Sequence, residues 1–305
     1  MENNNRGSII WGGGAAICVV FFWSGWIVIS RLGVTGHLTI FDLTGLRHGI
    51  GAVVALPYII WSRAWRGLTP WRTLILTLTA GAPYALLSYS GFIYAPAAHG
   101  GVFLNGCLPI FTTLFAWIWL GQRSRFSQMV GLVIILAGVT LVGYEGFLSS
   151  GGSMTWIGDL LFLAAIALFA LFMVANQVWS VNPGQVIFSI TIVPAVVYTP
   201  IWLLWLDSNL TSAPASEIIL QGAYQGLVPS VVGISCLNIA VRHIGPRATS
   251  ALVSSVPVVA ALAAIPVLNE LPGLPAWIGM ITVSFGILLA LGIIGFHQQV
   301  ATAGE

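Results

Sequence analysis

The ionisable side chains that could do chemistry within this sequence are few, and they fall in or beside long apolar stretches. They are Asp42, Arg47, His48, His99 and Asp159. An ionised group in hydrocarbon is costly and usually marks a functional site. Arg47 could bind a substrate carboxylate, although a role in anchoring its helix is the favoured interpretation. We expect both aspartates to stay solvated at the outer ends of their stretches, and His99 to be a solvated junction residue.

Neutral polar side chains within the apolar stretches are better candidates for a binding site. A hydroxyl or amide that faces lipid is unfavourable, so each should face other helices. Tyr84 and Ser88 are four residues apart and share a helix face, and Trp23 and Trp26 could stack on an aromatic or apolar substrate. Each alone could instead serve only helix packing. Together they predict a largely uncharged substrate cavity formed by Trp23, Ser24, Arg47, Tyr84, Ser88, Asn105, Tyr224, Asn238 and Ser254.

No group of residues in the sequence predicts an enzyme. HExxH and GxSxG motifs are absent, and a chain without lysine has no P-loop. Cys18, Cys107 and Cys236 lie singly in apolar stretches, which argues against a disulfide framework or a metal cluster. We also find no filter motif of a channel. We therefore expect a protein with no catalytic residues, no metal and no other cofactor.

The composition explains where these residues must lie. Of 305 residues, 58% are hydrophobic and only 6% are charged, with a net charge of +2. A soluble domain of this size needs many more charged residues on its surface. A soluble enzyme, a disordered chain and a nucleic-acid binder are excluded. The expected partners are the lipid bilayer and a small-molecule substrate, and the protein is expected to be a monomer or a weak homodimer.

The apolar stretches predict ten transmembrane helices, because a helical span needs roughly 20 mostly apolar residues. They lie at about 9–30, 41–62, 72–94, 99–120, 127–144, 156–178, 185–206, 217–240, 248–268 and 275–296. The first is interpreted as a span, since it lacks the cleavage site of a signal peptide. The predicted fold class is an all-α polytopic membrane protein.

The arginines predict the orientation of the chain in the membrane. With a cytoplasmic N-terminus, the segments on that side hold Arg6, Arg63, Arg66, Arg72, Arg123, Arg125, Arg242 and Arg247, whereas only Arg31 falls on the other side. Cytoplasmic segments of membrane proteins are enriched in basic residues. We expect a multi-pass protein of the inner (cell) membrane with both termini in the cytoplasm.

The two halves of the sequence correspond at an offset of 148 residues. Pro109 then coincides with Pro257, Gly131 with Gly279 and Gly138 with Gly286. We predict two repeats of five spans, residues 1–148 and 149–305, which form one membrane unit. Because five is odd, the repeats enter the membrane in opposite directions, as in many secondary transporters. Kinks at Pro109 and Pro257 are the predicted hinges on which the halves would rock.

The unit that repeats resembles the EamA family of the drug/metabolite transporter superfamily, and within it the YddG-type exporters of aromatic amino acids. The Leu46-Arg47 pair also resembles the family pattern. Gln122 departs from it, because the family usually has Glu at that position. The repeated landmarks are Pro109, Gly121-Gln122, Gly131 and Ala137-Gly138, and then Pro257, Asn269-Glu270, Gly279 and Gly286.

The sequence thus predicts a secondary transporter that exports small amphipathic solutes, foremost aromatic and other apolar amino acids, by alternating access. The alternative is a broad drug/metabolite or nucleotide-sugar exchanger of the same superfamily. A nucleotide sugar would need several cations in the cavity, and only Arg47 is available. Because no carboxylate is expected deep in a span, facilitated diffusion is favoured over proton exchange.

Overall fold

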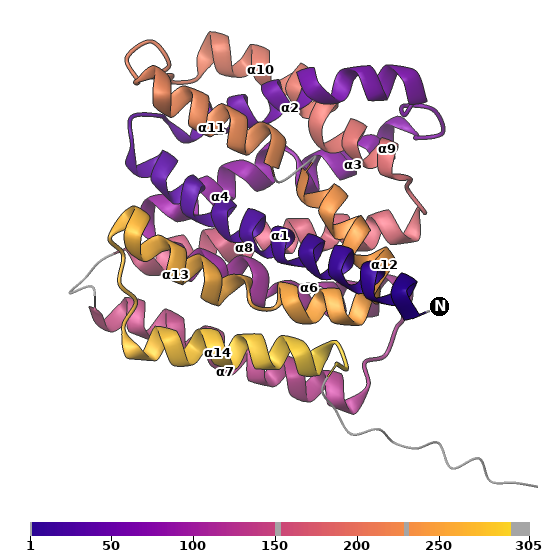
Figure 1. Cartoon of the computed structure of the whole chain (residues 1–305). Coiled ribbons are helices and arrows are strands. Elements are labelled where there is room, and N and C mark those ends of the chain that lie inside the picture. Colours follow the sequence, from indigo (N-terminus) through magenta and orange to yellow (C-terminus); the bar gives the residue numbers. More distant parts are fainter. Residues whose placement is uncertain (1, 150–153, 229–231, 294–305) are drawn as a thin grey trace, which may run out of the picture.

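The structure is a computed structural model that describes residues 2–149, 154–228 and 232–293, and within these ranges it is helical without strands (Figure 1). The first half contains α1 (Glu2–Thr35), α2 (Ile40–Ser62), α3 (Pro70–Ala80), α4 (Ala82–Tyr94), α5 (Ala97–Gly100), the π-helical η1 (Gly101–Gly106), α6 (Leu108–Leu120) and α7 (Phe126–Ser149). The third predicted span is broken at Gly81, where α3 ends and α4 begins.

The second half contains α8 (Thr155–Val178), α9 (Pro183–Ile187), η2 (Phe188–Ile192), α10 (Val193–Trp205), α11 (Ala215–Leu227), α12 (Gly233–Val253), α13 (Val256–Leu268) and α14 (Leu274–Ala290). Gly245 interrupts α12 with a φ of 80°, a backbone conformation that glycine adopts without steric cost. The part of α12 before Gly245 therefore belongs to the predicted eighth span, and the part after it belongs to the ninth.

Six apolar helical segments are long enough to cross a membrane, namely Ile10–Thr35, Ile40–Ser62, Ala97–Leu120, Phe126–Phe147, Thr155–Val178 and Pro183–Trp205. They match six of the ten predicted spans. A pair of helices bent by 57°, Ser235–Val253 and Val256–Leu268, covers the end of the eighth span and the ninth, and the tenth is the shorter helix Leu274–Ala290. The third is also divided, because α3 ends and α4 begins at Gly81, and the eighth includes residues 229–231, which lie outside the described residues.

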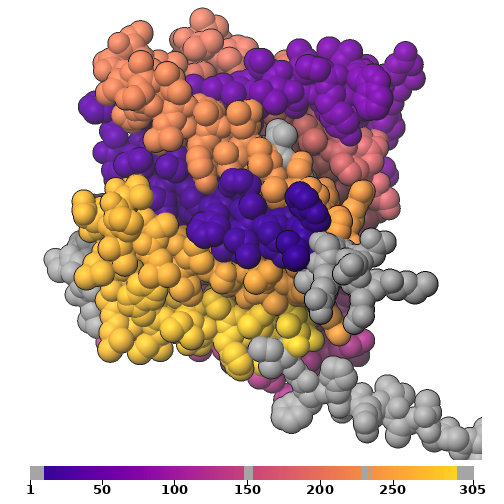
Figure 2. Space-filling view, in the orientation of Figure 1, coloured from indigo at the N-terminus to yellow at the C-terminus, as the bar shows by residue number. Residues whose placement is uncertain are grey.

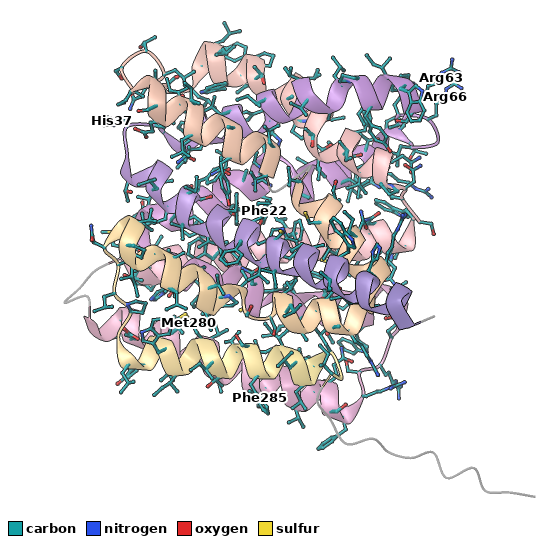
Figure 3. All side chains as sticks on the ribbon, in the orientation of Figure 1. Phe22, His37, Arg63, Arg66, Met280 and Phe285 are labelled. Carbon is teal, nitrogen blue, oxygen red and sulfur yellow. The ribbon has the colours of Figure 1, made fainter. Side chains whose placement is uncertain are left out.

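The bundle has an apolar exterior and two distinct ends. Exposed side chains include Trp61, Phe126, Phe147 and Trp205, as expected of a surface that contacts lipid. In Figures 1 and 2, α1 crosses the middle of the visible face, between α11 and α13, and it packs on both. His37 lies at one end of the bundle, and Arg63 and Arg66 lie at the other (Figure 3). We name the end that holds His37 the Glu270 end, and the end that holds Arg63 and Arg66 the Arg123 end.

Four glycines join the last helices of the two halves, α7 and α14, which lie side by side (Figure 1). A Cβ built on Gly138 would lie 2.7 Å from the Gly279 carbonyl oxygen, and one on Gly286 would lie 3.0 Å from the Gly131 carbonyl oxygen. The helices are therefore antiparallel. The 148-residue offset converts the Gly131–Gly286 contact into the Gly279–Gly138 contact, which is the exchange that a two-fold axis produces.

Candidate substrate site

Arg47 of α2 points into the bundle, between α1 and α4. Its guanidinium carbon lies 5.6 Å from the ring centroid of Trp26 and 6.0 Å from that of Tyr84. The two rings are stacked on each other, with centroids 6.4 Å apart. Such cation–π contacts stabilise a guanidinium away from water. Arg47 Nη1 and Trp26 Nε1 are buried and make no hydrogen bond of normal geometry, although the Tyr89 hydroxyl is a neighbour of both side chains; a carboxylate could satisfy these donors.

A network of neutral polar side chains borders the Arg47 cluster through Tyr89, which interacts electrostatically with Arg47. The Tyr89 hydroxyl donates to Gln225 Oε1 over 2.9 Å, and Gln225 Nε2 lies 3.1 Å from Ser30 Oγ. Gln221 Nε2 donates to the Ile29 carbonyl over 2.8 Å. The sequence analysis missed these residues, although two glutamines four residues apart in an apolar span are a signal that could have revealed them.

The residues predicted for the cavity fall into two groups. Arg47 and Tyr84 come together, with Trp26 rather than Trp23 as their aromatic neighbour. Several others contact neighbouring helices along α1, since Ser24 Oγ donates to the Val256 carbonyl and Tyr224 Oη donates to the Phe22 carbonyl. Trp23 lies close to Gly233. Ser88, Asn105 and Ser254 hydrogen-bond to the carbonyls of Tyr84, Gly101 and Ala251 within their own segments.

Asn238 does not fit the expectation that every such residue is buried among helices. It lies on α12 and is exposed. Helical periodicity placed it on one face with Tyr224, but Asn238 lies on α12 and Tyr224 on α11, and residues 229–231 between these helices lie outside the described residues.

The predicted hinges lie at corresponding helix starts. Pro109 is the second residue of α6, directly after η1 ends, and Pro257 is the second residue of α13, directly after α12 ends. Proline is accepted there because its missing N–H would have no helical partner. Gly101 packs against Pro257, since a Cβ on Gly101 would lie 3.2 Å from Pro257 Cα. The start of η1 in the first half thus contacts the start of α13 in the second.

Asp42 is buried and not solvated, so the expectation of a wet carboxylate was wrong. Its Oδ1 accepts from Trp202 Nε1 at 3.0 Å and Ser208 Oγ at 2.6 Å, and its Oδ2 accepts from the backbone N–H groups of Thr39 at 3.0 Å and Asn209 at 2.9 Å. The segment after α10 folds over the start of α2 and covers the carboxylate. Asp42 is therefore a structural connection between these elements.

We expect Asp42→Asn to destabilise the protein, because an amide nitrogen would replace one accepting oxygen and oppose two donors. A buried donor left without a partner costs about 1–3 kcal/mol. The thermal transition, followed by tryptophan fluorescence in detergent, should fall by several degrees. Asp207→Asn is the matched control, since Asp207 is exposed at the same end. Equal transitions for Asp42→Asn and the unmodified protein would contradict the structural role.

His99 and Asp159 also differ from expectation, because both are buried and paired. His99 Nδ1 lies 2.8 Å from Asp159 Oδ1, and the His99 ring stacks on Phe103. His99 also lines a cavity of about 390 Å³ at the Glu270 end, together with Glu145 and Glu270. The sequence showed two residues near span ends, but it did not show that α5 and α8 pack them against each other.

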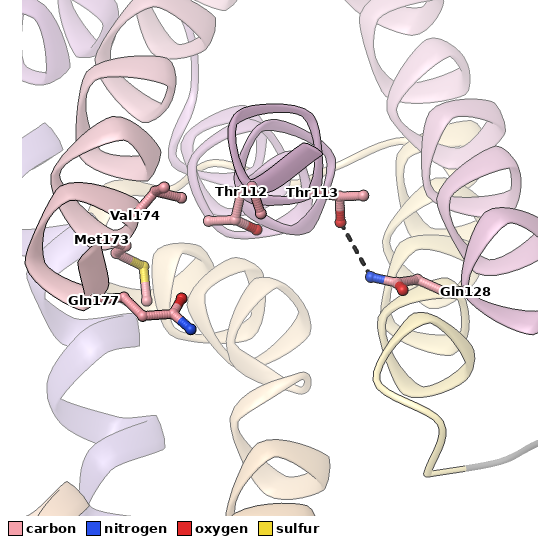
Figure 4. Close-up of a pocket in the computed structure, with 7 residues that line it drawn as sticks. Thr112, Thr113, Gln128, Met173, Val174 and Gln177 are labelled. Atoms are coloured by element: carbon pink, nitrogen blue, oxygen red, sulfur yellow. Dashed lines mark hydrogen bonds between the residues drawn. The ribbon is translucent and has the colours of Figure 1, made fainter. Parts of the chain in front are cut away.

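A second pocket, of about 280 Å³, is lined by residues of α6, α7 and α8 (Figure 4). Its polar lining comes from Thr112, Thr113, Gln128 and Gln177, and Met173 contributes an apolar side chain. Gln128 Nε2 donates to Thr113 Oγ1 over 3.2 Å. The two described pockets therefore differ in charge, since the pocket at the Glu270 end holds ionisable groups and this one holds neutral groups.

An apolar helical exterior and six helices long enough to cross a membrane define the chain as a polytopic membrane protein. The sequence pattern of the EamA-like transporter family matches residues 10–144 and 156–292, one match in each half, and the chain belongs to this family. The family match confirms the resemblance, and it makes a transport function the expected one.

Individual relatives are more distant. Over 240 residues the chain is 23% identical to a protein of Streptantibioticus cattleyicolor named probable terminal-alkyne amino-acid exporter, covering 74% of this chain and 75% of that protein. It is 30% identical over 144 residues to human solute carrier family 35 member F6, covering 41% of this chain and 38% of that one. A solved crystal structure with 17% identity aligns over 95% of this chain and 98% of its own, with a TM-score of 0.56, and so shares the fold.

Proposed function

We propose that this transporter exports amino acids with aromatic or other apolar side chains, and that Arg47 binds the substrate carboxylate. The observation that carries the proposal is the buried Nη1 of Arg47, which lacks a partner beside the Trp26 and Tyr84 rings. A guanidinium donates charge-assisted hydrogen bonds to a carboxylate, and the adjacent rings offer an apolar surface for a side chain. The relative named as an amino-acid exporter supports this substrate class.

The main alternative is a broad drug/metabolite or nucleotide-sugar exchanger. A diphosphate carries more negative charge than the single Arg47 guanidinium of this cluster would balance, which favours a substrate with one carboxylate. A competition assay with purified protein in proteoliposomes separates the two. Unlabelled phenylalanine, tryptophan and leucine should inhibit flux of labelled phenylalanine, whereas nucleotide sugars and cationic drugs should not. Inhibition by the last two alone would contradict the proposal.

The transport cycle that we propose is alternating access between two inverted repeats. It is supported by the antiparallel exchange of glycine contacts between α7 and α14 and by the matched positions of Pro109 and Pro257. The Arg123 end is proposed to face the cytoplasm of a cell with an inner membrane, since basic residues gather there. A terminal reporter that is active only outside the cytoplasm would contradict this orientation.

If the proline breaks are hinges, the double variant Pro109→Ala and Pro257→Ala should transport several-fold more slowly and bind substrate normally. Alanine removes the proline ring that keeps the preceding turn apart, so that the helix can extend across the break; this raises the barrier between conformations but leaves the Arg47 cluster intact. Turnover and binding in proteoliposomes measure both quantities. Pro57→Ala is the control, because Pro57 lies inside the continuous helix α2. Unchanged turnover in the double variant would remove the hinge role.

A further inference from the structure

The transport site described above does not use the acid–base pair of His99 and Asp159. Their exposed fractions are only 5% and 6%, and 2.8 Å separates His99 Nδ1 from Asp159 Oδ1. The pair is electrically neutral when it holds one proton in addition to the fixed N–H of the imidazole. Without that proton it carries a net negative charge in a region that water reaches poorly, which is unfavourable.

The groups around the pair increase this penalty. Glu145 of α7 and Glu270 of the α13–α14 connection line the same cavity as His99. Glu145 Oε1 accepts from the Gly273 N–H, but its Oε2 is buried without a partner. Arg31 of α1 is the nearby cation, and it is paired with Glu270. Cys107, which lies between η1 and α6, also faces Asp159. A proton lost from the pair would therefore leave a further negative charge beside the cavity that Glu145 and Glu270 line.

The pair is also connected to a contact that closes the Glu270 end. Arg31 Nε donates to Glu270 Oε1 over 2.7 Å, and Arg31 Nη1 donates to the Phe92 carbonyl. Glu270 Oε2 accepts from the Ala97 N–H over 2.7 Å. Ala97 and His99 belong to the same short helix, α5. This one turn is thus held by Glu270 on one side and by Asp159 on the other, and it joins α1, α4, α8 and α13.

We propose that the His99–Asp159 pair is a proton-binding site whose bound proton keeps the Glu270 end of the transporter closed. At low pH the pair is occupied and α5 stays clamped. As the pH rises the proton leaves, the remaining charge is repelled by Glu145 and Glu270, and this end opens. Facilitated diffusion was favoured because no carboxylate was expected deep in a span. The buried Asp159 carboxylate removes that reason.

The cavity allows a test that needs no substrate. Ala264 lines the cavity and is buried, so Ala264→Cys, in the full chain without its three native cysteines, reports opening by its rate of labelling with a membrane-impermeant maleimide. Leu271→Cys, in the exposed connection nearby, corrects for the effect of pH on thiol reactivity. Between about pH 5 and 8, where histidines titrate, the corrected rate should rise. One linked proton shifts the equilibrium by up to about tenfold per pH unit.

His99→Gln and Asp159→Asn should each remove this pH dependence. The matched control is His37→Gln, because His37 also pairs with a carboxylate at this end, Glu217 at 3.0 Å, but is 65% exposed. It should keep the dependence of the unmodified protein. A flat profile in the unmodified protein, a retained dependence in His99→Gln, or its loss in His37→Gln would each overturn the proposal. If Asp159→Asn does not fold, His99→Gln decides alone, and His99→Asn serves if neither folds.

Because labelling reports conformation only, this experiment can fail while amino-acid export stands, and it can succeed while the proposed substrate is wrong. A flux assay then separates gating from coupling. If the proton also travels through the cycle, an acidic medium on the Glu270 side should accelerate export, and His99→Gln should abolish that acceleration. If the pH gradient accelerates export equally in the unmodified protein and in His99→Gln, the role of the His99–Asp159 pair in coupling is overturned.

Discussion

Arg47→Gln is expected to weaken phenylalanine binding by about tenfold to 100-fold. A hydrogen bond to a charged group contributes about 1.5–3 kcal/mol, and each 1.4 kcal/mol corresponds to a factor of about ten in affinity. The variant loses both the charge and the planar donor that lies against Trp26 and Tyr84. Arg47→Lys keeps the positive charge but loses the paired N–H donors of the guanidinium. Its affinity for phenylalanine should therefore lie between those of the unmodified protein and Arg47→Gln. Binding of labelled phenylalanine to detergent-solubilised protein measures these differences.

The ligand provides the control for this prediction. Phenylalanine amide lacks the carboxylate, so it should bind weakly to the unmodified protein and no more weakly to Arg47→Gln. Comparing the two ligands on the two proteins forms a double-mutant cycle, which isolates the interaction between the guanidinium and the carboxylate. Arg72→Gln is the matched protein variant, since Arg72 also lies over a tryptophan, Trp179, at 5.5 Å but away from the Arg47 cluster. If Arg47→Gln lowers stability but leaves phenylalanine affinity unchanged, Arg47 only anchors its helix.

The second large effect is expected for Glu270→Gln, at the end of the bundle that Arg31 closes. Glu270 is only 20% exposed and accepts from both Arg31 and the Ala97 N–H. Removing its charge should cost the closed form about 1–3 kcal/mol. The backbone amides of residues 92–100 and 265–273 should then exchange with deuterium about tenfold faster, because the closed form protects them. Mass spectrometry of these peptides measures the rate.

Arg31→Gln should produce a similar increase, and the double variant should exchange no faster than either single variant if the two residues form one contact. Additive effects would show that the two side chains act separately. Peptides covering residues 60–72, at the Arg123 end, are the internal control and should not change. Faster exchange at both ends would indicate general destabilisation and would contradict a local closing contact.

The fold could be predicted from the sequence because its strongest signal, hydrophobicity, is summed over about 20 consecutive residues in each span. Apolar length alone located the six continuous spans, and Pro257 indicated the bend before α13. The break between α3 and α4 and the reversal at Gly245 were less accessible. These depend on backbone geometry at single glycines, and many glycines in the same sequence remain inside regular helix.

The site was predicted less completely, since a sequence gives the position of a residue along a helix but not the rotation of that helix against its neighbours. Arg47 and Tyr84 were expected in the cavity, and of the two tryptophans that could stack there, Trp23 was placed in the cavity set whereas Trp26 is the neighbouring ring. Asp42 was expected to be solvated because it lies at a span end. It is buried because Ser208 and Asn209, far away in sequence, fold over it.

The glycine contacts of α7 and α14 bear on how the two halves can diverge after a gene duplication. At Gly131, Gly138, Gly279 and Gly286, an added methyl group would meet the backbone of the other half. Backbone atoms cannot be exchanged by a compensating substitution. Elsewhere the copies can drift apart, as Gln122 and Glu270 have done at equivalent positions. At this interface the backbone of each half excludes a side chain from the other half, so these four glycines should be the last residues to be replaced.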